Sequence, residues 1–121
     1  MTARLARQAL VSLECEVSPA TSIALALFLA HKALPDLILS ENMMTDGNGL
    51  DFLREVKSDW ELKSIPFVLM DESHDNILKE AGLSAGADRI IIRPGLAAEF
   101  LQIVKPFLRK RKQWRPEESP E

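Results

Sequence analysis

A glutamate stands at the end of an apolar segment and opens a loop of polar and glycine residues. The stretch "LILSENMMTDGNG" covers residues 37–49, and Glu41 directly follows the run that ends at Ser40. In parallel α/β proteins, functional groups are commonly placed at the tip of a strand, beside a glycine-containing loop. A carboxylate there can hold a cation or act as a nucleophile, so Glu41 is the first candidate for a functional residue.

The surrounding chain predicts alternating helices and strands that would position this loop. Apolar residues recur at helical spacing in some segments, whereas others are short continuous apolar runs typical of buried parallel strands. The order α-β-α-β-α-β-α-β-α predicts a parallel sheet with helices on both faces. The expected helices lie near 2–12, 23–32, 49–60, 77–81 and 100–108, and the expected strands are "CEVSPA", "DLILS", "IPFVLM" and "RIII".

Local signals refine the helix ends. Thr21 or Ser22 can cap the second helix, and Asn48 can cap the third. The third helix should carry one apolar stripe, formed by Leu50, Leu53, Val56 and Trp60. Pro106 should kink the last helix, because its ring removes a backbone hydrogen bond.

Composition predicts a single domain and excludes several classes of protein. The 121 residues include 15 Lys+Arg and 18 Asp+Glu, and the net charge of −3 argues against a general nucleic-acid binder. The longest apolar run, Ile23–Ala30, is too short to span a membrane. A lone cysteine, Cys15, fits a reducing cytoplasm and is expected to be a small core residue. We expect a domain over 1–108 and a basic, then acidic, disordered tail over 109–121.

Four segments, in order and at the right spacing, resemble the receiver domains of two-component response regulators. The resemblance covers residues 2–108 and implies a flavodoxin-like (CheY-like) doubly wound sheet of order 2-1-3-4-5. It also implies Mg²⁺-dependent transfer of a phosphoryl group onto an aspartate, with a hydroxyl and a lysine nearby. The segments are "CEVSPA…IALALFLAHKALPDLIL", "ENMMTDGNGLDFLREVK", "IPFVLMDE" and "AGLSAGADRIIIRPG".

The chain departs from that pattern wherever the family's chemistry takes place. Counting back eight residues from Gly49 puts Glu41, rather than Ser40, at the phosphoacceptor position, and glutamate is one methylene longer than aspartate. Asp71 stands in place of a hydroxyl residue, and Arg93, before Pro94, replaces the lysine. The resemblance therefore implies a degenerate pseudo-receiver. In the loop between Glu41 and Asn48, Thr45 replaces the proline of the family pattern.

The family's first strand and its acidic pair have no counterpart in this sequence. We expect no cofactor or metal, since only Glu41, the Met43 carbonyl and Asp71 would remain to hold a cation such as Mg²⁺. Three accounts stay open: a start assigned too late or a truncation, a strand supplied by another chain, and a sheet that closes up without it. We favour the first account, because the rest of the pattern is intact.

Two of the remaining candidate sites have two readings each. Glu41, Asp71 and Arg93 could form a fixed ion-pair cluster, or their charges could simply be solvated. The second helix is apolar on nearly all sides, so its outer side could meet a partner, or the helix could simply be buried. His31 and His74 lack a second ligand at metal spacing and are expected to be isolated surface residues.

The sequence favours a non-catalytic signalling module that acts through a protein partner or a homodimer, in the cytoplasm, with no role for membrane or nucleic acid. One alternative is a genuine phosphoacceptor receiver whose first strand is missing from this chain, in which case Mg²⁺ would be required. A weaker alternative is a small-ligand binder that uses the pocket at the strand ends.

Overall fold

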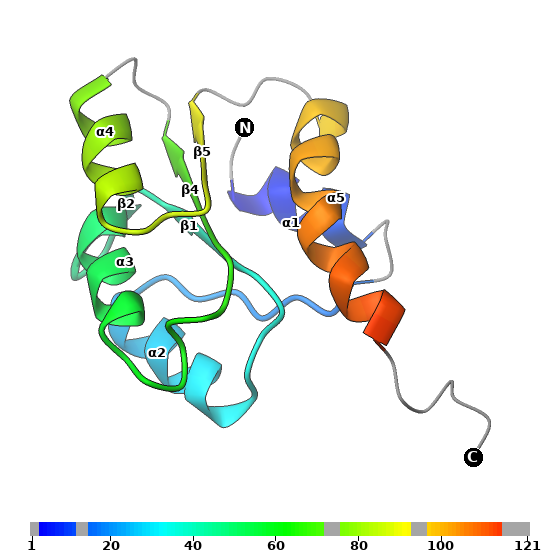
Figure 1. Ribbon diagram of the computed structural model, residues 1–121, viewed down its shortest axis with the longest axis horizontal. Coiled ribbons are helices and arrows are strands. Elements are labelled where there is room, and N and C mark those ends of the chain that lie inside the picture. The colour runs from blue at the N-terminus through cyan, green and yellow to red at the C-terminus, as the bar shows by residue number, and fades with distance from the viewer. Residues whose placement is uncertain (1–2, 12–14, 72–75, 93–96, 115–121) are drawn as a thin grey trace.

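The computed structural model describes residues 3–11, 15–71, 76–92 and 97–114. Helices and strands alternate along most of this length, as Figure 1 shows. In chain order the elements are α1 (Ala3–Val11), α2 (Ile23–Lys32), β1 (Ile38–Glu41), β2 (Met43–Met44), β3 (Gly47–Asn48), α3 (Gly49–Lys57), β4 (Phe67–Asp71), α4 (Asn76–Ser84), β5 (Arg89–Ile92) and α5 (Ala97–Trp114).

A parallel sheet of order β1-β4-β5 forms the centre of the molecule. Ile38 of β1 lies opposite Phe67 of β4, and Val68 of β4 lies opposite Arg89 of β5. In β4, Phe67, Val68 and Leu69 are all fully buried, because both faces of the strand are covered. The predicted flavodoxin-like α/β class is confirmed.

Helices cover both faces of this sheet. In Figure 1, α1 and α5 lie on one side of the strands, and α2, α3 and α4 lie on the other. The side chains of β4 alternate accordingly: Phe67 and Leu69 belong to the core on the α2–α3 side, whereas Val68 and Met70 belong to the core on the α1–α5 side. The sheet is therefore the middle layer of three.

The core on the α2–α3 side is built around aromatic and aliphatic side chains. The Phe52 ring of α3 meets the Phe67 ring edge to face, with centroids 5.4 Å apart. Leu53 and Val56 are fully buried on the same face of α3, as the predicted stripe requires. Burial of each large side chain stabilises the fold by about 1.5–3 kcal/mol, so this core fixes α3 on the sheet.

Trp60 does not belong to that stripe, and this part of the prediction is wrong. The α3 helix ends at Lys57, with Ser58 as its C-cap, so the helical spacing no longer applies at residue 60. The Trp60 side chain is 84% exposed, and the Lys63 ammonium nitrogen lies 3.8 Å from the centre of its ring. The Lys63 ammonium therefore lies over the Trp60 ring at the surface, and Trp60 contributes nothing to the core.

The predicted strand "CEVSPA" is also wrong, because residues 15–20 join no sheet. A strand requires a neighbouring strand with free backbone groups, and β1 is paired only with β4 in the described part of the chain. The account in which the sheet closes up without the missing strand would pair residues 15–20 with β1, and the described strands include no such pair. Cys15 and Val17 are half-buried and pack against the core on the α1–α5 side, where a core position was expected for Cys15.

The last helix continues beyond the expected boundary of the domain. Pro106 lies inside α5, and the helix reaches Trp114 before the described residues end. Phe100 and Val104 are fully buried against β4 and β5, whereas Lys105 and Pro106 are exposed. The kink at Pro106 and the separation of residues 109–121 as a tail stay predictions.

Candidate functional site

Glu41 is the last residue of β1 and lies at the carboxyl edge of the sheet. The side chains of Ile38 and Ser40 are buried, whereas Glu41 is half-buried, as the alternation of a strand requires. The Ser40 hydroxyl donates to the Glu41 carbonyl at 2.9 Å. Ser40 is thus enclosed in the interior, whereas the side chain of Glu41 is half-exposed at the carboxyl edge of the sheet.

A short hairpin follows Glu41, where the sequence predicted only a loop. Met43 pairs with Asn48, and Met44 with Gly47, so β2 and β3 run antiparallel around a turn at residues 45 and 46. The Asn48 side-chain oxygen accepts a hydrogen bond from the Asp51 amide at 2.8 Å, which confirms Asn48 as the N-cap of α3. Hairpin and helix are therefore one continuous unit. The Met43 side chain, at the start of that unit, is 83% exposed.

Gly49 is required because the chain passes unusually close to β1 at this point. Its amide donates to the Asn42 carbonyl at 2.7 Å. A Cβ atom on Gly49 would lie 2.6 Å from the Glu41 carbonyl oxygen and 2.5 Å from a methyl group of Leu69. The first of these neighbours is backbone and cannot move aside, so only glycine allows the hairpin to close beside Glu41.

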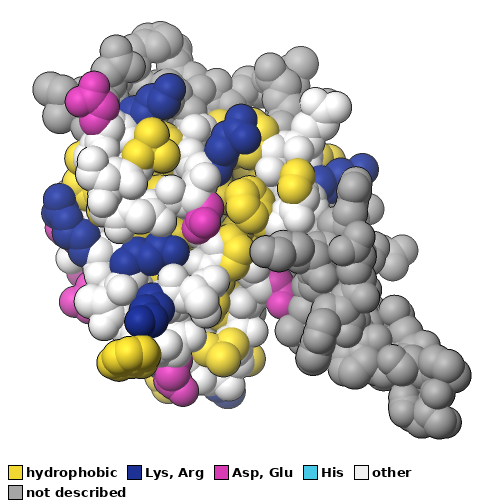
Figure 2. Space-filling model, in the orientation of Figure 1, with side chains coloured by type: hydrophobic (Ala, Val, Ile, Leu, Met, Phe, Trp, Pro, Cys, Tyr) yellow, Lys and Arg dark blue, Asp and Glu magenta, His cyan; other side chains and the backbone are white. Residues whose placement is uncertain are grey.

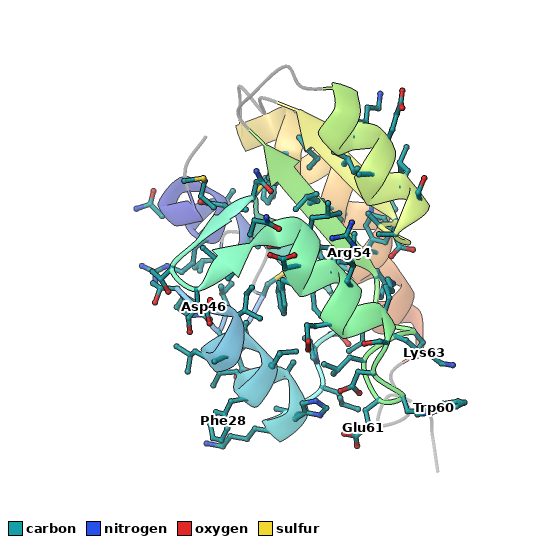
Figure 3. The ribbon with its side chains drawn as sticks, turned by 90° about the vertical axis from the view of Figure 1, so that its left-hand side faces the viewer. Phe28, Asp46, Arg54, Trp60, Glu61 and Lys63 are labelled. Carbon is teal, nitrogen blue, oxygen red and sulfur yellow. The ribbon has the colours of Figure 1, made fainter. Side chains whose placement is uncertain are left out.

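The turn of the hairpin is bonded to the beginning of α2. The Asp46 carboxylate accepts hydrogen bonds from the Ile23 amide at 2.7 Å and the Ala24 amide at 3.2 Å. These backbone bonds, led by that from Ile23, hold the pKa of Asp46 below its ordinary value. Figure 3 shows Asp46 beside the first turn of α2. The carboxylate thus satisfies free amides where the helix dipole favours negative charge.

Thr45 adds two further bonds to the same junction. Its amide and its hydroxyl both donate to the Thr21 carbonyl, at 3.2 and 3.1 Å. Proline, the residue of the family pattern at this position, has neither donor. Ser22 caps α2 locally, accepting from the Leu25 amide at 3.0 Å, as one of the two predicted alternatives. Thr45 therefore joins the hairpin to Thr21, just before α2, by two bonds that a proline at position 45 could not make.

Asp71 is the last residue of β4, so its backbone belongs to the sheet. The backbone of Asp71 ends β4 opposite Ile92 of β5, one residue beyond Met70, which pairs with Glu41. The sheet therefore brings the backbones of Glu41 and Asp71 to one edge. The side chain of Asp71, together with Arg93 and Pro94, lies outside the described residues. The ion-pair cluster of Glu41, Asp71 and Arg93 stays a prediction.

The described donors do not fit a Mg²⁺ ion well. Mg²⁺ prefers octahedral oxygen ligands, commonly carboxylates plus substrate phosphate. At this edge the described part of the chain offers the Glu41 carboxylate and the Met43 carbonyl as candidates, which is less negative charge than a paired acidic site supplies. A shallow hollow lined by Asp51, Arg54, Glu55 and Ser58 lies along α3 rather than between the strand ends.

His31 is not isolated, contrary to the prediction. One ring nitrogen, Nε2, lies 2.8 Å from Asp59 Oδ2, and the other, Nδ1, lies 2.8 Å from Glu61 Oε1. The hydrogen bond with Glu61 raises the pKa of His31 above its ordinary value, against an opposing effect of desolvation, and Asp59 adds to the rise. His74 lies outside the described residues.

The outer side of α2 is exposed and apolar. The Phe28 side chain is 61% exposed and Leu25 is 42% exposed, whereas Ala30 is buried against the sheet. The interpretation that α2 is simply buried on all sides is therefore wrong for this face. On the face drawn in Figure 2, apolar side chains also reach the surface between basic and acidic ones.

Sequence reasoning missed Asp46, Asp59 and Glu61. Asp46 is 23 residues from Ile23, and Glu61 is 30 residues from His31, so no local motif joins either pair. A usable signal was present only for Asp46, since the first turn of α2 contains no acidic residue of its own. Within the described residues, no helix combines the length and apolar character needed to cross a bilayer.

Comparison with known proteins finds one matching family model and several curated relatives. The family model "Response regulator receiver domain" matches residues 1–105. The chain is 36% identical over 87 residues to histidine kinase P4 of Formosa agariphila, covering 72% of this chain and 6% of the kinase. It is 30% identical over 76 residues to the phosphate regulon transcriptional regulatory protein PhoB of Escherichia coli, covering 63% of this chain and 33% of PhoB.

Solved structures of similar fold agree with the family model. A response regulator structure from Chloroflexus aurantiacus matches with a TM-score of 0.82 and 26% identity, covering 88% of each chain. The signal receiver domain of a histidine kinase from Syntrophus aciditrophicus matches with a TM-score of 0.80 and 24% identity, over 94% of this chain and 86% of that one. By contrast, this chain spans a third or less of the length of the first curated relatives.

Proposed function

The chain belongs to the response regulator receiver domain family, and on that basis we propose that it is a non-catalytic receiver-like module of a two-component-type signalling pathway. It acts in the cytoplasm through contact with a protein partner or with a second copy of itself. It catalyses no reaction, and its state is set by binding or assembly rather than by phosphorylation. The observation that carries this proposal is the residue at the phosphoacceptor position, Glu41.

Glu41 supports a loss of phosphotransfer for a geometric reason. Phosphoryl transfer depends on a nucleophile held in line with the leaving group, and a misplacement of about 1 Å can cost two orders of magnitude in rate. Glutamate carries its carboxylate one methylene farther from the backbone than aspartate does. The β1 backbone at Glu41 is fixed by its pairing with Met70, and Gly49 packs against the Glu41 carbonyl, so the strand cannot shift to compensate.

The bonds from the hairpin to α2 support a loop that is held in one state. Thr45 and Asp46 together tie the turn to Thr21, Ile23 and Ala24 through backbone groups. A loop that switches on phosphorylation has to break such contacts or do without them. In this chain the contacts are present while Glu41 is unmodified, which fits a module with a fixed site.

We include in the proposal the ion-pair cluster of Glu41, Asp71 and Arg93. A carboxylate at position 71 repels phosphate instead of donating to it, and a guanidinium at position 93 can bind a carboxylate with two parallel bonds. Such a cluster would replace the switchable contacts by permanent ones. The exposed apolar side of α2 supports the other half of the proposal, contact with protein.

The experiment is phosphodonor labelling in the presence of Mg²⁺. Wild-type protein, Glu41→Asp and Glu41→Gln are incubated with acetyl phosphate, and a mass increase of one phosphoryl group is measured by intact-protein mass spectrometry. We expect no incorporation by the wild type or by Glu41→Gln. Glu41→Asp tests whether the rest of the site still supports transfer.

Labelling of the wild type that is lost in Glu41→Gln would overturn the proposal in favour of a genuine phosphoacceptor receiver. The genomic sequence upstream of Met1 provides an independent check. An in-frame apolar strand ending in Asp-Asp would favour that alternative, and labelling would then be repeated on the longer chain. Mg²⁺ would be the cofactor in that case.

A further inference from the structure

Three potential metal ligands meet at the end of α2 that is farther from Asp46. His31 belongs to the last turn of α2, and Asp59 and Glu61 belong to the turn that follows α3. One donor atom from each lies within 4.8 Å of the other two. We propose that His31, Asp59 and Glu61 form a binding site for a divalent transition-metal ion, of which Zn²⁺ fits best.

Asp59 is oriented by backbone bonds that do not involve His31. Its Oδ1 atom accepts from the Glu61 amide at 2.8 Å and from the Leu62 amide at 3.3 Å. Its carbonyl accepts from the Lys63 amide at 2.8 Å, which closes the turn. The second carboxylate oxygen, Oδ2, is thereby directed at the imidazole. Ligands held by such supporting bonds are arranged before the ion binds, which lowers the cost of binding.

His31 is placed by the helix rather than by the carboxylates. The α2 helix is fixed on the sheet by Ala30, which is buried, and by Leu27, which packs on the same core. The backbone of His31 is therefore held by the packing of α2, whether or not its ring is bonded to the turn. The imidazole belongs to α2 and the carboxylates belong to the turn after α3. These two segments are packed separately, so the site does not depend on the ion for its assembly.

The donor set selects the class of ion. One imidazole nitrogen and two carboxylate oxygens suit Zn²⁺ and similar first-row ions, whereas Mg²⁺ and Ca²⁺ prefer oxygen ligands alone and Cu(I) prefers sulfur. Three protein ligands leave a fourth tetrahedral position for water or for a group from another molecule. A ligand supplied by a second protein chain would fit that position.

Only a small movement separates the present arrangement from a bound one. Ligand atoms of tetrahedral Zn²⁺ lie about 3.3 Å apart, given bonds of about 2.0–2.1 Å. Each carboxylate now contacts a different ring nitrogen of His31. One carboxylate must therefore move to share the ion, and the Glu61 side chain, 66% exposed, can do so, whereas Asp59 is held by the turn. Figure 3 shows Glu61 close to the last turn of α2.

The test uses Zn²⁺ by isothermal titration calorimetry and Co²⁺ by visible absorption, on the chain purified without metal. We expect one equivalent of Zn²⁺ to bind, and we expect Co²⁺ to give the intense visible bands of a four-coordinate site. Zn²⁺ at about 1 mM should raise the melting temperature, since an ion that binds only the folded state stabilises it by mass action. His31→Gln and Glu61→Gln should each weaken binding by about tenfold or more.

His74→Gln is the matched control, because the chain has only two histidines. It should leave the Zn²⁺ titration unchanged. Failure of the wild type to bind Zn²⁺ at about 1 mM, where mass action would reveal any tighter site, overturns the proposal and leaves only an ion pair. Binding that survives in His31→Gln, or that is lost in His74→Gln, overturns it equally. The Glu41 labelling result is independent of every outcome here.

Discussion

The two ends of α2 are both bonded to distant segments, but by different kinds of contact. At the N-terminal end, Asp46 and Thr45 bond to backbone groups of residues 21–24. At the C-terminal end, His31 meets Asp59 and Glu61 through side chains alone. Backbone groups at a helix start need partners in any sequence, whereas exposed side-chain ion pairs contribute little in water. The first junction should therefore matter for stability, and the second for what it can bind.

The largest expected loss of stability comes from a substitution at Gly49, because it would displace the whole hairpin that bonds to the start of α2. Gly49→Ala places a methyl group against the Glu41 carbonyl and Leu69, and it should lower the free energy of unfolding by about 1–3 kcal/mol. This loss runs against helix propensity, which favours alanine over glycine by about 1 kcal/mol. Urea denaturation followed by circular dichroism measures it. An unchanged or higher stability would contradict a close approach of Gly49 to the Glu41 carbonyl.

Removing the carboxylate at the first junction should have the next largest effect. Asp46→Ala leaves the Ile23 and Ala24 amides without their acceptor, and helix-cap losses of this kind lower the melting temperature of a small domain by about 2–8 °C. Thermal denaturation provides the measurement. Glu80→Ala, which removes one exposed negative charge from α4, is the control and should change the melting temperature little. Equal effects of the two changes would mean that charge, not capping, is responsible.

The pH dependence of the same contact has a definite sign. The pKa of Asp46 is lower in the folded chain than its ordinary value of 3.8, so its contribution is present above that value and is lost as the pH falls through the folded pKa. Asp46→Asn should therefore lose less stability than the wild type when the pH is lowered below about 4. Melting curves between pH 3 and pH 7, set at about one-unit steps, test this. Parallel curves for the two proteins would contradict the assignment.

Thr45 offers a finer test of the same junction. Thr45→Pro removes both donors to the Thr21 carbonyl, whereas Thr45→Val removes only the hydroxyl. We expect melting temperatures in the order wild type, Thr45→Val, Thr45→Pro, with a total range of about 2–8 °C. Hydrogen exchange at residues 43–48 should accelerate in the same order. If Thr45→Pro is as stable and as protected as wild type, the hairpin is not held to α2 by these bonds.

The second junction should give the smallest change in stability. In metal-free buffer, His31→Gln is expected to shift the melting temperature by less than about 2 °C, because exposed ion pairs are worth little and are screened by salt. The same variant should abolish most of the stabilisation by Zn²⁺. A large fall in melting temperature without metal would mean that the two ends of α2 contribute alike to stability. That result would contradict the difference proposed between them.

Much of the molecule follows from local sequence. Continuous apolar runs predicted β1, β4 and β5, and helical spacing predicted the helices between them, because these patterns match the two faces of a covered sheet. Asn48 and one of the two caps proposed for α2, Ser22, act as N-caps because their partners lie three residues away. The apolar run was expected to end at Ser40 with Glu41 directly after it, and in the structure Glu41 is the last residue of β1.

Only the tertiary structure decided the contacts between distant segments. Residues 15–20 have the composition of a strand, yet a strand needs a paired neighbour, and none of the described strands pairs with them. Trp60 continued a helical spacing that had already ended at Lys57. Asp46 and His31 find their partners 22 to 30 residues away. Such contacts depend on how the elements pack, which local periodicity does not specify, and both junctions of α2 are of this kind.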